Sequence, residues 1–210
     1  MNKYLIVPTF CFLFASQYAA AQFKPGIVFL GGSVNAQYDG QNDSSGNSLR
    51  HSSTTGLSPS LGYYLDDHSA LGVGLGFIFN KSVDESDTSN ITVDHSFTYT
   101  LSPFYRYNAI VTDRFGFYGR VSPSLSYSID NQTSAPEEKT FTFSLPTRIG
   151  LYYFLFKRLS AETSIQVFNY SHATYFRSGD VIGTENNISL SFLNSFSLSN
   201  MSFTLLYYFH

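Results

Sequence analysis

Apolar and polar residues alternate along most of this chain, so that apolar side chains recur at every second position. In the segment 121–129, Val121, Leu125, Tyr127 and Ile129 share one face, while serines occupy the other. A period of two is typical of a β-strand with one apolar face. The same alternation predicts eight strands, over residues 26–38, 54–65, 70–80, 96–108, 115–129, 140–156, 159–170 and 201–209.

The connections between these strands alternate in length. Residues 66–68, 109–114 and 157–158 form short connections, whereas 39–53, 81–95, 130–139 and 171–200 form long polar ones. Outer-membrane barrels have short periplasmic turns and longer outer loops. The alternation therefore predicts an all-β, eight-stranded antiparallel up-and-down transmembrane β-barrel, with periplasmic turns near Asp66, Asp113 and Lys157. An immunoglobulin-like sandwich, the soluble alternative, has no reason to alternate in this way.

The composition agrees with a membrane barrel. Hydrophobic residues make up 43% of the chain and charged residues only 13%, which is about half the usual charged share of a soluble domain. Aromatic residues reach 18%, all of them Phe and Tyr. Beyond the N-terminal segment, no apolar run approaches the roughly 20 residues of a spanning helix. A barrel needs no such run, because only every second residue of a strand meets lipid.

The few charges inside the predicted strands all lie on the polar face. They are Arg106, Arg120, Arg148 and Glu162, accompanied by Gln166. An arginine that faced lipid at mid-membrane would cost about 2–4 kcal/mol, so this face is expected to line the interior. We predict a charge cluster that blocks the narrow lumen, in which Arg148 or Arg120 pairs with Glu162.

Aromatic residues gather next to the predicted short turns, as in the girdle that flanks the apolar band of a membrane barrel. They are Tyr63, Tyr64, Tyr105, Tyr107, Phe115, Phe117, Tyr152, Tyr153, Phe154, Phe156, Tyr207, Tyr208 and Phe209.

Glycine and proline make some strands irregular. Gly31 and Gly32 interrupt the alternation of the first strand, which leaves its facing open. Proline lacks the N–H that a closed ladder requires, so bulges or strand ends are expected at the prolines within strands. These are Pro59, Pro103, Pro123 and Pro146.

The N-terminus has the order of a secretory signal: a basic start at Lys3, a short apolar core, and small residues up to Ala21. The core is too short to span a bilayer as a retained anchor. Cleavage is expected after Ala21, with Ala19 completing the A-x-A site. The expected domains are a signal peptide over 1–21 and one barrel over 22–210. Cys11, the only cysteine, would leave with the signal.

The last strand carries an apolar face of Met201, Phe203, Leu205, Tyr207 and Phe209. A final strand that ends in an aromatic residue resembles the signal that outer-membrane barrels present to their insertion machinery, although here His210 follows the aromatic residue.

Three segments resemble the OmpA/OmpX-like outer-membrane β-barrel family, in the form common among Bacteroidetes. They are the turn region 62–74, the segment 102–107 and the Tyr207-Tyr208-Phe209 ending. The resemblance implies a barrel in the bacterial outer membrane. It leaves the activity open, because members serve as adhesins, anchors, resistance factors and small pores.

No enzyme chemistry is expected. A few outer-membrane barrels act on lipids through His, Ser and an acid, and the nearest candidates here are Ser171, His172 and Glu162. Ser171 and His172 are neighbours and would point to opposite faces of a strand. No metal or cofactor is expected either, because a set of acidic loop residues lacks the spacing of a calcium loop. The set is Asp84, Glu85, Asp87 and Asp94.

Two functions remain, a structural or surface-interaction role through the long loops and a small passive channel. The expected partners are outer-membrane lipids including lipopolysaccharide, the barrel-insertion machinery and an unidentified extracellular ligand. A formal net charge of −3 offers no basic surface for nucleic acid. We expect the barrel to be a monomer.

Overall fold

The computed structural model describes residues 23–42, 48–84, 92–131, 136–190 and 201–209. Within these ranges it contains ten β-strands. Their bounds are β1 Val28–Asn42, β2 Ser48–Tyr64, β3 Ser69–Asp84, β4 Thr92–Ile110, β5 Phe115–Val121, β6 Ser124–Asn131, β7 Glu138–Phe156, β8 Leu159–Arg177, β9 Asp180–Leu190 and β10 Met201–Phe209. The described part of the chain holds no helix that is long and apolar enough to cross a membrane.

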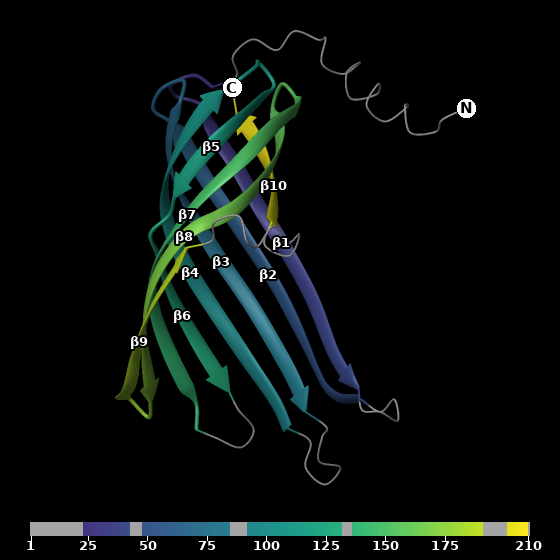
Figure 1. The fold of residues 1–210 in the computed structure, drawn as a ribbon, viewed down its shortest axis with the longest axis vertical. Helices are drawn as coiled ribbons and strands as arrows, with labels where there is room; N and C mark the ends of the chain where they lie inside the picture. The colour runs from purple at the N-terminus through teal and green to yellow at the C-terminus, as the bar shows by residue number, and fades with distance from the viewer. Residues whose placement is uncertain (1–22, 43–47, 85–91, 132–135, 191–200, 210) are drawn as a thin grey trace, which may run out of the picture.

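Every pairing in the sheet is antiparallel. Consecutive strands lie side by side from β1 to β5 and from β6 to β9 (Figure 1). The sheet bends round until its first and last strands meet, where Val28–Gly32 of β1 pair with residues 205–209 of β10. The fold is therefore the antiparallel barrel that the alternation predicts. Beyond this seam, toward the far end of β1, the described residues of β1 pair only with β2.

The strand count differs from the eight expected, because two positions in the ring are each filled by two strands. β5 and β6 follow one another between β4 and β7. They are separated by Ser122 and Pro123, and proline cannot donate to the ladder. In the same way, β9 and β10 both pair with β8, β9 along its second half and β10 along its first.

The four prolines behave differently. Pro123 marks the end of a strand, as expected, and Pro146 lies beside the register shift between Thr147 and Arg148. Pro103 lies within β4 opposite Val73, with no register shift on that side. On its other side, residues 102–104 have no ladder partner, because β5 ends and β6 begins there. The ladder between β2 and β3 has no partners for Ser58 and Pro59.

The β8–β9 hairpin overturns part of the expected loop 171–200. Residues 171–177 continue β8, and β9 follows after a tight turn. Ser178 and Gly179 both have positive φ, at 53° and 94°, which is the two-residue turn that suits a twisted hairpin. The other long connections are also shorter than expected, since β1, β2, β3 and β4 run further than their apolar faces.

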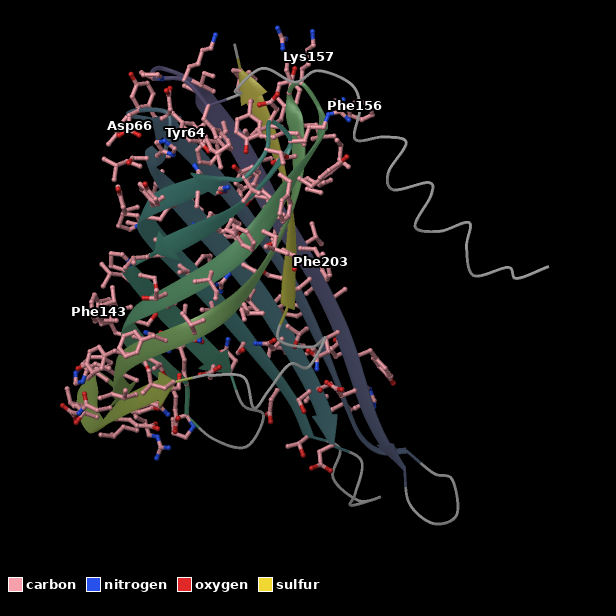
Figure 2. The ribbon with its side chains drawn as sticks, turned by 45° about the horizontal axis from the view of Figure 1, so that its top comes forward. Tyr64, Asp66, Phe143, Phe156, Lys157 and Phe203 are labelled. Carbon is pink, nitrogen blue, oxygen red and sulfur yellow. The ribbon has the colours of Figure 1, made fainter. Side chains whose placement is uncertain are left out.

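The short turns all lie at one end of the barrel, here called the turn end, and the opposite end is called the loop end. Figure 2 shows Asp66 and Lys157 together at the turn end. One oxygen of Asp66 accepts the backbone N–H groups of His68 and Ser69, each at 2.7 Å. These hydrogen bonds hold the pKa of Asp66 below its ordinary value of 3.8. They shape the turn between β2 and β3.

Large apolar side chains cover the outside of the barrel from the turn end toward the loop end. Figure 2 shows Phe143 and Phe203 on this outer surface. Phe203, Leu205, Tyr207 and Phe209 of β10 all point outward, as their alternation predicts. Beyond the apolar band, the strands continue with polar and charged residues such as Lys81, Asp94 and Lys139.

Candidate functional site

An aromatic layer lies inside the barrel at the turn end. Phe23, which precedes β1, lies at its centre and is 2% exposed. Its ring centroid is 4.7 Å from that of Tyr64 and 5.2 Å from that of Tyr152. Phe154 and Tyr208 complete the ring around it, at 5.4 and 6.0 Å. Tyr64 and Tyr208 have no exposed surface, so the layer leaves them no contact with water.

Glycines on neighbouring strands make room for these rings. A Cβ atom on Gly62 would lie 2.1 Å from the ring of Phe29, and one on Gly150 would lie 2.6 Å from the ring of Tyr118. A side chain at either position would collide with the aromatic ring beside it. The glycines thus let large rings pack flat against the inner wall of a narrow barrel.

A buried ion pair crosses the lumen next to the aromatic layer. Arg106 Nη1 of β4 donates to Glu162 Oε2 of β8 at 2.8 Å, and both side chains are 3% exposed. This corrects our expectation that Arg148 or Arg120 would pair with Glu162. Arg106 lies four residues from the end of β4, and Glu162 lies three residues from the start of β8. Both are therefore close to the turn end, whereas Arg148 lies eight residues from the end of β7.

Hydrogen bonds tie the ion pair to the aromatic layer. Asn108 accepts from Arg106 Nε at 2.7 Å and donates to the hydroxyl of Tyr64 at 3.0 Å. On the other side, the hydroxyl of Ser160 lies 3.1 Å from that of Tyr208 and 3.5 Å from Glu162 Oε1. The guanidinium of Arg106 also lies over the ring of Tyr118, at 4.1 Å. Hydrogen bonds and ring contacts therefore join the ion pair and the aromatic layer inside the barrel.

Arg120 and Arg148 lie further from the turn end. The guanidinium of Arg120 lies over the ring of Phe104 at 3.8 Å, and its Nε donates to Ser122 at 2.9 Å. Arg148 stands directly opposite Arg120 on the neighbouring strand, and Gln166 stands opposite Arg148. The structure thus places four of the predicted polar residues in one row across β4, β5, β7 and β8, in the order Arg106, Arg120, Arg148 and Gln166. Of the three arginines, only Arg106 forms an ion pair with Glu162.

Small hydroxyl side chains line the lumen toward the loop end. The hydroxyls of Thr98 and Ser128 lie 2.9 Å apart, and those of Thr100 and Ser126 lie 2.8 Å apart. Ser124 and Ser144 form a similar pair at 2.6 Å. The interior is therefore polar beyond the aromatic layer.

The residues considered for catalysis do not come together. Glu162 and His172 lie ten positions apart on β8, which corresponds to about 33 Å along a strand. The ring Nδ1 of His172 lies 2.8 Å from the side-chain oxygen of Asn186 on β9. The carboxylate of Glu162 forms an ion pair with Arg106. Among the described residues, no three metal-binding side chains form a group, while Glu85 and Asp87 lie outside the described ranges.

Several central residues were assigned wrongly or missed in the sequence. Tyr64, Tyr152, Phe154 and Tyr208 are not part of an outer girdle, because they are buried inside the barrel. The alternation could have shown this, since each is adjacent to an outward-facing residue. Asn108 lies on the same inner face as Arg106, so its burial was also detectable. Phe23 precedes the first strand, and no periodicity pointed to it.

The predicted signal peptide, with Ala19 and Ala21, lies outside the described residues. Its cleavage, and the recognition of β10 by insertion machinery, stay predictions.

Comparison with a known structure supports the barrel. The outer membrane protein OprG from Pseudomonas aeruginosa superposes with a TM-score of 0.53 at 13% sequence identity, covering 90% of this chain and 99% of that chain. The Neisserial surface protein A (NspA) gives a TM-score of 0.43 at 11% identity, covering 92% of this chain and 100% of that chain. No protein of curated function matches the sequence.

The family comparison covers nearly the whole chain. The family described as "Outer membrane protein beta-barrel domain" matches residues 7–205. This agrees with the strand order and the outward apolar band, and it supports a location in the bacterial outer membrane. The chain belongs to the outer membrane protein beta-barrel domain family.

Proposed function

We propose that this protein is a closed outer-membrane barrel that acts through its loop end and conducts neither ions nor solutes. The observation that carries the proposal is the layer of buried aromatic side chains inside the turn end of the barrel. Phe23, Tyr64, Tyr152, Phe154 and Tyr208 are all 2% exposed or less. An eight-stranded barrel leaves an interior only wide enough for side chains, so such a layer leaves little room for a water path.

The alternative is a small passive channel, and the ion pair weighs against it. A channel would require the bridge between Arg106 and Glu162 to open on each passage. Separating a buried ion pair leaves unpaired charge in a dry environment, which costs several kcal/mol. One hydrogen-bonded network joins the ion pair to Tyr64, Asn108 and Ser160. Opening the ion pair would therefore also require these side chains to move.

The loop end supports a surface role because it extends well beyond the membrane. A tilted membrane strand needs about 9–11 residues, whereas β4, β7 and β8 each contain 19. The additional residues carry polar and charged side chains, including Asp94, Glu138 and Arg177. They form a rigid sheet that can present its edges and tips to another molecule.

The β8–β9 hairpin is the most prominent described part of this end. Tyr175 donates to Glu185 at 2.8 Å across the two strands, and Arg177 forms an ion pair with Glu138 of β7. Val181 and Ile182, next to the tip, are 60% and 50% exposed. Exposed apolar residues on an ordered hairpin are suited to contact with a partner at the cell surface.

Cysteine labelling on intact cells tests whether the hairpin faces outward. Cys11 is the only natural cysteine and lies in the predicted signal, so single cysteines can be introduced without background. A membrane-impermeant maleimide is expected to label Asp180→Cys on intact cells, because this exposed residue directly follows the hairpin turn.

The matched control is Asp67→Cys at the turn end, which should react only after the outer membrane is permeabilised. Labelling of Asp67→Cys on intact cells, with Asp180→Cys protected, would reverse the orientation and remove the basis for a surface role.

A further inference from the structure

Three arginines stand side by side on neighbouring strands. Arg106 of β4 is the register partner of Arg120 on β5, and Arg120 is in turn the partner of Arg148 on β7. Directly opposite residues on antiparallel strands have Cβ atoms about 4.5–5.5 Å apart, and like charges in such positions destabilise a sheet. All three side chains line one cavity inside the barrel, so their positive charges face the same space and repel one another.

The carboxylate in this cavity compensates only one of the three charges. Glu162 pairs with Arg106. No carboxylate of the described residues lies within ion-pair distance of Arg120 or Arg148. Arg120 has Phe104 and Ser122 as neutral partners, and these orient the guanidinium without neutralising it. The cavity therefore carries two positive charges in excess.

The cavity also offers hydrogen-bond donors. Its volume is about 30 Å³, and the hydroxyls of Ser164, Ser202 and Thr204 line it together with the arginines. Nη2 of Arg106 is buried and has no hydrogen-bond partner among the described residues. An unsatisfied buried donor on a charged group is costly, and a ligand that accepts hydrogen bonds would satisfy it.

We propose that this cavity is a binding site for a small monovalent anion of about the size of chloride, held by Arg120, Arg148 and the free Nη2 of Arg106. An anion placed between the guanidinium groups removes the repulsion along the row and accepts charge-assisted hydrogen bonds from them. A volume of about 30 Å³ admits one water-sized species. This volume favours a monatomic anion over larger anions such as sulfate and gluconate. The inference concerns the interior alone and holds whether or not the barrel conducts.

Halide-dependent stability tests the site. The thermal midpoint of the folded barrel in detergent would be measured in sodium chloride, sodium bromide and sodium gluconate at equal ionic strength. The midpoint is expected to be higher in chloride and bromide than in gluconate, by roughly 3–5 °C when the halide exceeds its dissociation constant about tenfold.

Variants assign this shift to the site. Arg148 is the most exposed of the three arginines, and its guanidinium lies over no aromatic ring of the described residues. Arg148→Gln should therefore abolish the halide-dependent shift without removing a ring contact. In gluconate the same variant should be at least as stable as the parent, because one repulsive charge is gone. Lys157→Gln, in the exposed turn between β7 and β8, removes a charge outside the lumen and should keep the full shift.

A halide shift in Arg148→Gln equal to that of the parent would overturn the proposal, as would equal midpoints of the parent in all three salts. Crystals of the parent grown in bromide provide a direct second measurement. An anomalous peak between Arg120 and Arg148 is expected, and its absence at a bromide concentration that raises the midpoint would also refute the site.

Discussion

Replacing Glu162 with alanine is expected to destabilise the folded barrel by about 3–5 kcal/mol, because the change leaves the buried guanidinium of Arg106 without its counter-charge. Both side chains of the pair are 3% exposed, so water cannot replace the lost carboxylate. Urea unfolding of the purified barrel in lipid vesicles measures the effect. Glu185→Ala on the exposed β8–β9 hairpin is the matched control and should change stability by no more than about 0.5 kcal/mol.

A double variant tests the effect of the unpaired charge separately from the effect of lost side-chain volume. Arg106→Met combined with Glu162→Leu removes both charges, and replacement of a whole buried pair by apolar residues is often neutral. The double variant should therefore regain most of the stability that Glu162→Ala loses. An unchanged unfolding midpoint for Glu162→Ala would contradict a stabilising role of the buried ion pair.

Replacing Tyr208 with alanine is expected to cost about 3–5 kcal/mol, the range found when a large buried aromatic residue is truncated. Its ring contacts Phe23, Phe29 and Phe154 and has no exposed surface. Tyr207 lies one residue away on the outer face and is 40% exposed. Tyr207→Ala removes a similar ring from that face. Its cost in the same urea titration should be clearly smaller.

Tyr208→Phe then distinguishes packing from hydrogen bonding. It keeps the ring and removes only the hydroxyl that lies 3.1 Å from Ser160, so a loss of about 1 kcal/mol is expected. Equal losses for Tyr207→Ala and Tyr208→Ala would contradict the view that the inner aromatic residues form the layer that fills the lumen.

The barrel could be predicted from the sequence because lipid imposes a strict rule on each strand. The faces predicted from the alternation around Arg106 and Arg120 agree with the structure, since a misplaced charge would meet lipid. No such rule governs the polar strands beyond the membrane. In that region the Ser178-Gly179 turn is the only local sign of the β8–β9 hairpin. The sequence pattern of residues 171–190 predicts a loop and not two strands.

The partner of Glu162 could not be predicted for a different reason. Periodicity tells which residues face inward, but it gives no level along the barrel axis. That level depends on the stagger of the strands, which places Arg106 and Glu162 near the turn end together. The role of Phe23 depends on how the chain enters the barrel before β1, and strand patterns contain no information about this segment.

Current through single molecules in a planar lipid bilayer tests most directly whether the lumen is closed. The purified parent is expected to show no stable conductance, because the layer around Phe23 and the pair of Arg106 and Glu162 cross the interior. A variant that combines Phe23→Ala with Tyr208→Ala should show openings that the parent lacks. Long-lived, uniform channels in the parent, with an ion selectivity that changes in Arg120→Gln or Arg148→Gln, would contradict the closed barrel.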